Sequence, residues 1–292
     1  PKALRFDEAS RAPLAREIVM LEQVAQAAVQ LDIVHFHLDC LHLPLFRRLG
    51  APYVTTLHGR LDLPELGPLY AEFVEAPLVS ISEAQRRPLN WANWIGTVHH
   101  GLPADLLRPA GEREGYLAFL GRICPEKRPD LAIRIALEAG CRLKIAAKVD
   151  KVDEVYFERE IRPLLAAPGI EFIGEIDESR KSEFLGHANA MLFPIDWPEP
   201  FGLVMIEAFA CGTPVIAFAR GSVPEIVEDG ITGRVVDGPS EAVAAIRSVP
   251  GFEPHRIRAT FERRFTSHRM AEDYLTLYRS LAETREPSLQ PA

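Results

Sequence analysis

The chain has 292 residues, of which 47% are hydrophobic and 25% are charged, and its formal net charge is -8. This length exceeds what one hydrophobic core usually supports, so we expect two domains. The negative charge argues against nucleic acid as a partner and against general binding to anionic lipid. No stretch approaches the run of ~20 apolar residues that crosses a bilayer, which excludes a transmembrane segment and leaves peripheral membrane contact open.

The cysteines and the start of the chain indicate the cellular setting. Cys40, Cys124, Cys141 and Cys211 are far apart and form no CxxC pair. Dispersed thiols of this kind are typical of a reduced cytoplasmic protein, and they predict neither zinc nor a disulfide framework. The segment Pro1–Arg5 has no apolar core of a signal peptide and no initiator methionine. We therefore expect the chain to begin partway into its natural product.

Short apolar runs alternate with amphipathic stretches, which predicts an α/β fold with parallel sheets and right-handed crossovers. The strands expected in the first part are Ile33–His37, Tyr53–Leu57, Leu78–Ile81 and Thr97–His99. Those expected in the second part are Tyr116–Leu120, Arg142–Ala147, Ile170–Ile173, Ala190–Phe193, Val215–Phe218 and Arg234–Val236. Helices are expected at Leu14–Gln30, Pro129–Ala139, Tyr156–Leu165, Ser179–His187, Ser240–Arg247 and Met270–Leu281.

The segment from Gly101 to Gly115 is rich in proline, glycine and charge and has no periodic pattern, which marks a domain boundary. We predict an N-terminal Rossmann-like domain at 1–108, a C-terminal Rossmann-like domain at 109–273, and a C-terminal helix and tail at 274–292. Four strands are few for a doubly wound domain, so the N-terminal domain is expected to be incomplete.

The most specific motif runs from Glu199 to Glu207 and reads EPFGLVMIE. Gly202 allows close backbone approach where a helix begins at about Leu203. Free backbone N–H groups at that helix start predict a site for a phosphate or another anion. Glu199 in the loop and Glu207 one turn inside the helix could reach different parts of one ligand. Taken alone, the same acids would also fit a solvated loop and helix.

Further candidates follow other predicted strands. Gly121 and Arg122 close one strand and Lys127 lies in the next turn, where two cations could hold a diphosphate. His58 directly follows another strand, at the edge where open α/β sheets bind ligands. Alone, Lys127 would be a solvated loop cation and His58 a structural histidine. Together with the two glutamates, they predict one ligand site.

These segments together resemble the retaining GT-B glycosyltransferases of family 4, from about Asp32 to Leu281, and Glu199–Glu207 matches the family's E-x7-E motif. The resemblance implies two Rossmann-like domains that face each other across a cleft. It also implies an enzyme that transfers a sugar from a nucleoside-diphosphate sugar, most simply UDP- or GDP-linked. The acceptor stays unknown, with a glycan, a lipid or a small molecule as candidates.

The resemblance also implies a role for each candidate residue. Arg122 and Lys127, beside Gly121, would neutralise the donor diphosphate, and Glu199 would contact the donor sugar. Glu207 would hydrogen-bond the ribose. The remaining implied contacts are the amides of Phe201, Gly202 and Leu203 for sugar and phosphate, Ile173 and Gly174 for the nucleobase, and His58, which would face the transferred sugar from the other domain.

The implied mechanism retains the anomeric configuration by front-face attack, so Glu199 is not a nucleophile. The sequence has no Asp-x-Asp motif, and the two cations Arg122 and Lys127 would therefore replace a metal; we expect no cofactor. Members of this family usually open with a strand and a glycine-rich loop. Nothing before Asp32 resembles that segment, and no Gly-Gly pair occurs, so we expect it to be missing.

Other functions fit part of the pattern. His35 and His37 share one face of a strand and could bind a metal, but no third ligand is evident nearby. A dinucleotide-dependent oxidoreductase would share the α/β layers, but no GxGxxG follows a strand. A GT-B sugar-nucleotide epimerase and a non-catalytic nucleotide-sugar-binding protein stay as alternatives. The fate of the donor distinguishes the three functions. Sugar transfer or slow hydrolysis supports a transferase, interconversion of two nucleotide sugars supports an epimerase, and tight binding without turnover supports a binding protein.

Overall fold

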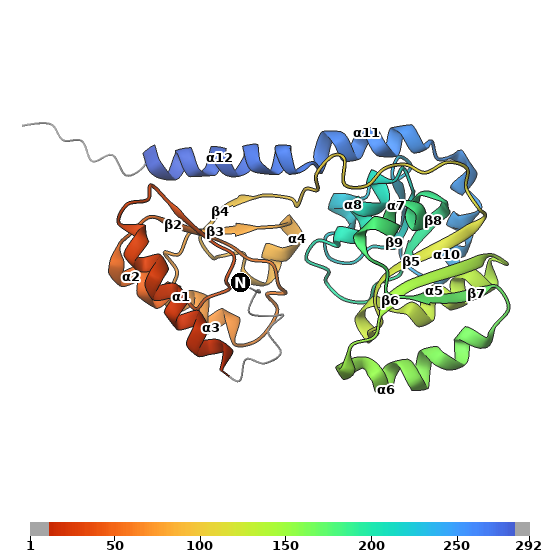
Figure 1. The fold of residues 1–292 in the computed structure, drawn as a ribbon, viewed down its shortest axis with the longest axis horizontal. Coiled ribbons are helices and arrows are strands. Elements are labelled where there is room, and N and C mark those ends of the chain that lie inside the picture. The colour runs from red at the N-terminus through yellow and green to blue at the C-terminus, as the bar shows by residue number, and fades with distance from the viewer. Residues whose placement is uncertain (1–11, 284–292) are drawn as a thin grey trace, which may run out of the picture. The chain divides into compact units, whose positions relative to one another are not determined.

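The computed structural model describes residues 12–283, whose contacts divide the chain into two compact units (Figure 1). The first unit comprises the described residues up to Ser80, Leu89–Thr97, and the described residues from Tyr274 onward. The second comprises Ile81–Pro88 and Val98–Asp273. The boundary between the units thus falls within the last described helix, whose residues from Tyr274 onward belong to the first unit. No described helix is both long enough and apolar enough to span a membrane.

The first unit is built on a four-stranded parallel sheet. Its strands lie side by side in chain order as β1 Val34–Phe36, β2 Tyr53–Thr56, β3 Leu78–Ser80 and β4 Trp94–Thr97. The helical segments that accompany them are α1 Pro13–Ala28, α2 Leu43–Leu49, α3 Leu66–Glu72 and the end of α12 Ser267–Glu283, and the turn η2 Arg87–Leu89 is divided between the two units. Val34 and Phe36 pack with apolar residues of α1 and α2, so this stretch of β1 is buried.

The second unit is built on a six-stranded parallel sheet with the order β10-β9-β8-β5-β6-β7. Its strands are β5 Tyr116–Arg122, β6 Arg142–Lys148, β7 Ile170–Gly174, β8 Ala188–Phe193, β9 Val215–Phe218 and β10 Gly233–Val236. Its α-helices are α4 Glu83–Arg86, α5 Pro129–Glu138, α6 Glu154–Tyr156, α7 Glu178–Gly186, α8 Leu203–Ala210, α9 Val223–Ile226, α10 Pro239–Ile246, α11 Pro254–Arg264 and the start of α12. Short helical turns occur at η3 Pro125–Lys127, η4 Lys151–Asp153, η5 Phe157–Ile161, η6 Arg162–Ala166 and η7 Val249–Gly251.

The strand order of the second sheet reverses between β5 and β8. After β5 the chain adds β6 and β7 on one side, and it then returns to place β8 on the other side of β5. Open α/β sheets bind ligands at the carboxyl ends of the two strands that flank such a reversal. The loops that follow β5 and β8 are therefore the first place to look for a site.

Successive residues of β5 pack into two separate cores. Tyr116 and Ala118 belong to a cluster that includes residues of α8 and α11. Leu117 and Phe119 belong to another cluster, with residues of α5 and α10. A strand covered on both faces is apolar at every position rather than at alternate ones. This confirms the interpretation of the continuous apolar runs as strands of a parallel sheet.

The fourth strand of the first unit differs from its prediction. The sequence predicts a strand at Thr97–His99, whereas β4 begins at Trp94 and ends at Thr97, and it pairs with β3 with a register shift between Leu78 and Val79. Gly96 interrupts the β-branched pattern and conceals the strand. A Cβ at Gly96 would lie 2.9 Å from the Leu277 side chain of α12, so the close packing of that helix favours glycine here.

The helix predicted at Tyr156–Leu165 is irregular in the structure. It consists of α6 Glu154–Tyr156, a π-helical turn at Phe157–Ile161 and a 3-10 turn at Arg162–Ala166. Pro163 explains part of this difference, because it has no N–H group to donate to the carbonyl four residues earlier. The other predicted helices are confirmed with boundary shifts of a few residues.

Gly233 tests the packing of the edge strand β10 against β9. A Cβ at Gly233 would lie 1.9 Å from the carbonyl oxygen of Val215, a backbone atom that cannot move without separating the strands. We expect Gly233→Ala to lower the free energy of unfolding by about 1–3 kcal/mol, measured by urea denaturation. Gly67→Ala is the control, because Gly67 lies in α3 with open space around it, and it should be neutral or slightly stabilising. Equal losses in both variants would contradict the packing argument.

Candidate functional site

Lys127 and Glu199 meet where the strand order of the second sheet reverses. Lys127 lies in the turn after β5, and Glu199 lies in the loop after β8. Lys127 Nζ forms an ion pair with Glu199 Oε2, and Glu199 is only 7% exposed. The two loops are also joined by their backbones, because Asp196 N–H donates to the Glu126 carbonyl at 2.9 Å. The structure thus brings together two candidates that the sequence predicted from separate motifs.

Aromatic side chains surround this ion pair. Lys127 Nζ lies 5.4 Å from the ring centre of Phe193 and 5.3 Å from that of Trp197. Trp197 Nε1–H donates to the same oxygen of Glu199 at 2.8 Å. Apolar surroundings strengthen such polar contacts and fix the side chains that make them. Sequence reasoning did not assign this role to Trp197, and its only signal was its position two residues before Glu199.

The backbone of the Glu199 loop is held by Gly221 and Ser222. Ser222 N–H donates to the Glu199 carbonyl at 2.9 Å, and Ser222 Oγ donates to the Phe201 carbonyl at 2.8 Å. Gly221 has φ 54°, and a Cβ there would lie 2.3 Å from both N and O of Glu199. The Phe201 side chain is buried in the core, so only the backbone of Phe201 is available for its predicted role. Neither Gly221 nor Ser222 is among the residues predicted from the sequence, because their contacts with Glu199 and Phe201 are long-range.

Helix α8 begins directly after this loop, with Gly202 as its N-cap. Gly202 has φ 80°, in the left-handed region that favours glycine, and a Cβ there would lie 2.8 Å from Met205 Cε. No side chain caps the helix start, and its first turn contains no acidic residue. Leu203, the first helical residue, is 46% exposed. The start of α8 therefore has neither a side-chain cap nor an acidic residue in its first turn to balance its partial positive charge, which suits an anionic ligand.

Glu207 lies inside α8 and is 8% exposed. Its Oε1 accepts a hydrogen bond from Lys181 Nζ of α7 at 2.7 Å, and Lys181 also pairs with Glu178 at 2.9 Å. Its Oε2 is buried and has no hydrogen-bond partner among the described residues. Burial raises the pKa of Glu207, and Lys181 opposes part of this shift. A buried acceptor without a donor is costly, so Oε2 is suited to a hydroxyl of a ligand.

Arg122 is the last residue of β5, the strand that Lys127 follows, but it has different partners. Its Nε lies 3.4 Å from Asp153 Oδ2, and its Nη1 lies 3.9 Å from Asp150 Oδ2, both in the segment after β6. About half of the Arg122 side chain is exposed. The two predicted cations thus have separate acidic partners, and their convergence on one diphosphate stays a prediction. Sequence spacing did not reveal the roles of Lys181, Asp150 and Asp153, because these contacts are long-range.

Three other predicted residues end strands at this edge of the second sheet. Gly121 lies near the end of β5, and Ile173 and Gly174 end β7. A Cβ at Gly121 or Gly174 would meet no atom within 4 Å, so a ligand could approach either backbone. Ile173 is half-buried and packs against the core cluster that contains Phe193. Their predicted contacts with phosphate and nucleobase stay predictions.

His58 lies in the first unit, within a cluster of three histidines. His58 Nε2 is 2.8 Å from His37 Nδ1, and the ring centres of His37 and His35 are 4.2 Å apart. His35 Nδ1 contacts the Tyr278 hydroxyl at 2.6 Å, and its Nε2 contacts Thr56 Oγ1 at 2.7 Å. Both ring nitrogens of His35 are therefore engaged with hydroxyl groups. Within residues 12–283, no group of three or more His, Cys, Asp or Glu side chains could hold a metal ion.

One partly buried histidine, His35, and one fully buried histidine, His42, predict that the first unit is sensitive to acid. Burial lowers the pKa of His35 and of His42 from 6.5 to about 4, and the charge of His37 adds to the shift of His35. Because the unfolded chain binds these protons more readily, the stability that they contribute is complete above pH 6.5 and is lost as the pH falls towards 4. At about 1.4 kcal/mol for each pKa unit, we expect the free energy of unfolding to fall by a few kcal/mol.

Urea denaturation at a series of pH values measures this loss. His42 stacks on Phe36 with ring centres 3.9 Å apart, so His42→Phe keeps an aromatic ring at this position and removes one titrating group. The variant should lose less stability than the wild type between pH 6.5 and 4. An unchanged pH dependence in His42→Phe would contradict the assignment.

Gly221 provides a test of how the Glu199 loop is positioned. Gly221→Ala places a methyl group against the Glu199 backbone and should displace the Lys127–Glu199 pair. We expect a loss of about 2–4 kcal/mol in the free energy of unfolding, measured by urea denaturation. Gly230→Ala is the matched control, because Gly230 also has a positive φ, 78°, but has open space around its Cβ position. If both variants lose the same stability, backbone strain alone explains the effect.

Residues 108–250 match the family model described as glycosyl transferases group 1. One similar curated protein is D-inositol 3-phosphate glycosyltransferase 2 of Catenulispora acidiphila, 31% identical over 188 residues, which cover 56% of this chain and 44% of that protein. Another is D-inositol 3-phosphate glycosyltransferase of Mycobacterium bovis, 33% identical over 159 residues, which cover 49% of this chain and 33% of that protein. The chain thus spans less than half the length of these curated relatives.

Solved structures with the same fold cover most of the chain. Sucrose-phosphate synthase from Thermosynechococcus elongatus has a TM-score of 0.75 at 20% identity, over 91% of this chain and 78% of that one. AviGT4, a glycosyltransferase involved in avilamycin A biosynthesis, has a TM-score of 0.70 at 24% identity, over 90% and 78%. Anabaena HepE in complex with UDP has a TM-score of 0.72 at 18% identity, over 91% and 81%.

These likenesses confirm the predicted fold class, an α/β fold of the GT-B kind with two Rossmann-like units. The candidate residues of the second unit, from Gly121 to Glu207, all lie within the segment that matches the group 1 glycosyl transferases.

Proposed function

We propose that this chain carries the donor site of a retaining glycosyltransferase that uses a nucleoside-diphosphate sugar. The observation that carries the proposal is the buried Lys127–Glu199 pair at the reversal of the strand order, next to the uncapped start of α8. An ion pair alone would fit a purely structural role. The unpartnered Glu207 Oε2 on the same helix favours a ligand, because it is a second group in the same region with unused bonding capacity.

Lys127 and the start of α8 would stabilise the departing nucleoside diphosphate. As the bond to the sugar breaks, negative charge develops on the β-phosphate. Positive groups that are already fixed stabilise this charge without further reorganisation. A lysine ammonium group has three N–H donors, so Lys127 can keep its contact with Glu199 and still donate to phosphate oxygens. Arg122 would contribute in the same way if its ion pairs with Asp150 and Asp153 loosen when the donor binds. We propose that these cations act in place of a metal.

Glu199 and Glu207 would orient the donor. Glu199 is fixed by Lys127 and Trp197, and we propose that it accepts a hydrogen bond from the donor sugar rather than attacking the anomeric carbon. Glu207 is held through Oε1 by Lys181, which leaves Oε2 for a ribose hydroxyl. The backbones at Ile173 and Gly174 would contact the nucleobase. Front-face transfer with retention of configuration is the mechanism that fits these roles.

The comparisons favour particular substrates for a first test. Solved structures of Anabaena HepE contain UDP or UDP-glucose, so UDP-sugars are the first donors to test, followed by GDP-sugars. The curated relatives are named for D-inositol 3-phosphate, so a phosphorylated cyclitol is a rational first acceptor. Incubation with donor and acceptor, with and without EDTA, distinguishes the functions. Sugar transfer supports a transferase, interconversion of nucleotide sugars supports an epimerase, and tight binding without turnover supports a binding protein.

Lys127→Ala tests the proposed phosphate contact. We expect UDP to bind the variant at least about tenfold more weakly by calorimetry, because a charge-assisted hydrogen bond is lost. Lys144→Ala is the matched control, because Lys144 is also ion-paired with a glutamate and also lies over an aromatic ring, but it occurs within β6. Its UDP affinity should equal that of the wild type. Equal affinities in all three proteins would remove Lys127 from the site.

A further inference from the structure

A cavity of about 510 Å³ lies at the amino edge of the second sheet. Arg113, which precedes β5, and Asn189, near the start of β8, both line it. Lys127 and Glu199 follow the carboxyl ends of the same two strands, so this cavity is separate from the proposed donor site. Its volume is within the range of small-molecule sites. The walls are mostly apolar and include Leu117, Ile246, Val249, Phe252 and Pro254.

Among the described residues that line this cavity, Arg113 is the only charged one. Its Nη1 donates to the Asn189 carbonyl at 3.0 Å, but its Nη2 is buried and has no hydrogen-bond partner within residues 12–283. Burial lowers the pKa of Arg113, and no acidic neighbour opposes this shift. A guanidinium stays protonated even so. The cavity therefore holds a positive charge that the described part of the chain does not balance, which is an energetic cost.

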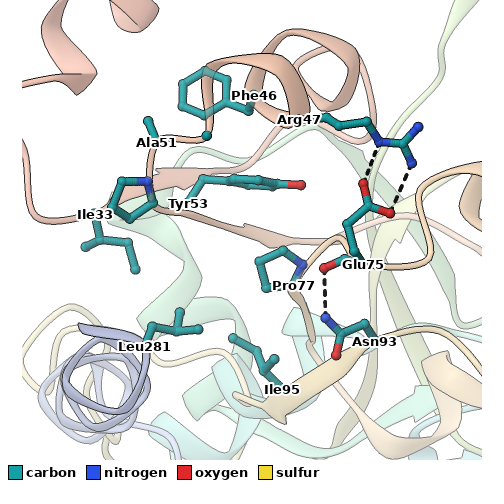
Figure 2. A pocket seen from close by; sticks show the side chains of 12 residues that line it. Ile33, Phe46, Arg47, Ala51, Tyr53, Glu75, Pro77, Asn93, Ile95 and Leu281 are labelled. Carbon is teal, nitrogen blue, oxygen red and sulfur yellow. Dashed lines mark hydrogen bonds and ion pairs between the residues drawn. The ribbon is translucent and has the colours of Figure 1, made fainter. Parts of the chain in front are cut away.

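An arginine at a cavity of the first unit is balanced by the chain itself. Arg47 lines a cavity of about 360 Å³ and is bound by Glu75, as Figure 2 shows. Arg47 Nη1 also pairs with Glu72 at 2.7 Å. The hydrogen bonds that Arg47 donates to Glu75 and Glu72 raise the pKa of Arg47. An anion would thus gain little at Arg47, whereas at Arg113 it would supply the missing partner.

We propose that the cavity at Arg113 binds a small molecule with one carboxylate and an apolar body, such as a medium-chain fatty acid. The planar guanidinium matches a carboxylate in charge and geometry, and the N–H groups of Nη2 have no partner among the described residues. The apolar walls remove the body of the ligand from water. An uncharged alcohol of the same length would leave the charge of Arg113 unbalanced, so the carboxylate should be preferred.

Calorimetry on the full chain tests this preference. The probes are decanoate and decan-1-ol, each below the concentration at which it aggregates. We expect decanoate to bind at least about tenfold more tightly than decan-1-ol, and Arg113→Gln to remove this difference. The variant should fold, because it removes a buried charge without a partner. Arg47→Gln is the control and should bind decanoate like the wild type. Equal affinity for the two probes in the wild type, or unchanged decanoate affinity in Arg113→Gln, would overturn the proposal.

The wild-type protein offers a second measurement that does not depend on any variant. The Cys141 thiol lines the same cavity, whereas Cys40 lies in the first unit. Bound decanoate should slow the reaction of Cys141 with a maleimide and leave the rate at Cys40 unchanged, as followed by mass spectrometry of peptides. With the cavity about nine-tenths occupied, the rate at Cys141 should fall about tenfold. No protection of Cys141 at saturating decanoate, or equal slowing at both cysteines, would exclude this cavity as the binding site.

Discussion

The parallel pairing of β5 with β8 is the constraint on which the candidate site depends. Tyr116 pairs with Ala188 and Ala118 with Met191, so the two strands end at the same edge of the sheet. In the sequence, β6 and β7 come between β5 and β8, so Lys127 and Glu199 are 72 positions apart. A buried carboxylate is costly unless a cation reaches it, and only this pairing of strands brings Lys127 within reach. The aromatic contacts of Trp197 and Phe193 follow from the same pairing.

Each glutamate of the motif is stabilised by a lysine from a different element. Lys127 pairs with Glu199, and Lys181 of α7 pairs with Glu207. Both carboxylates are thus fixed in position by partners within the chain, which fits a preorganised site rather than one assembled by its ligand. Bonding capacity is still left over at Glu207 Oε2 and at the start of α8. This combination of balanced charge and unused donors and acceptors separates the region from an ordinary buried salt bridge.

The two edges of the second sheet hold charge in different ways. At the carboxyl edge, Lys127, Arg122 and Lys181 all have acidic partners. At the amino edge, Arg113 has only the Asn189 carbonyl within hydrogen-bonding distance among the described residues. Both arrangements rest on the same strands, because Arg113 precedes β5 and Asn189 lies in β8. A ligand at one edge would therefore contact segments that are continuous with the other edge.

The sequence alone determined the α/β layers, because strands covered on both faces must be apolar throughout, and it determined the start of α8 through Gly202. It also identified Glu199, Glu207 and Lys127 as candidates from motif spacing. Only the tertiary structure decided that Lys127 pairs with Glu199, that Lys181 pairs with Glu207 and that Arg122 faces Asp153 instead. It likewise decided that β4 includes Gly96, whose Cβ position lies 2.9 Å from the end of the Leu277 side chain. Local periodicity reports which residues are buried but not which strands are neighbours, and these contacts depend on the neighbours.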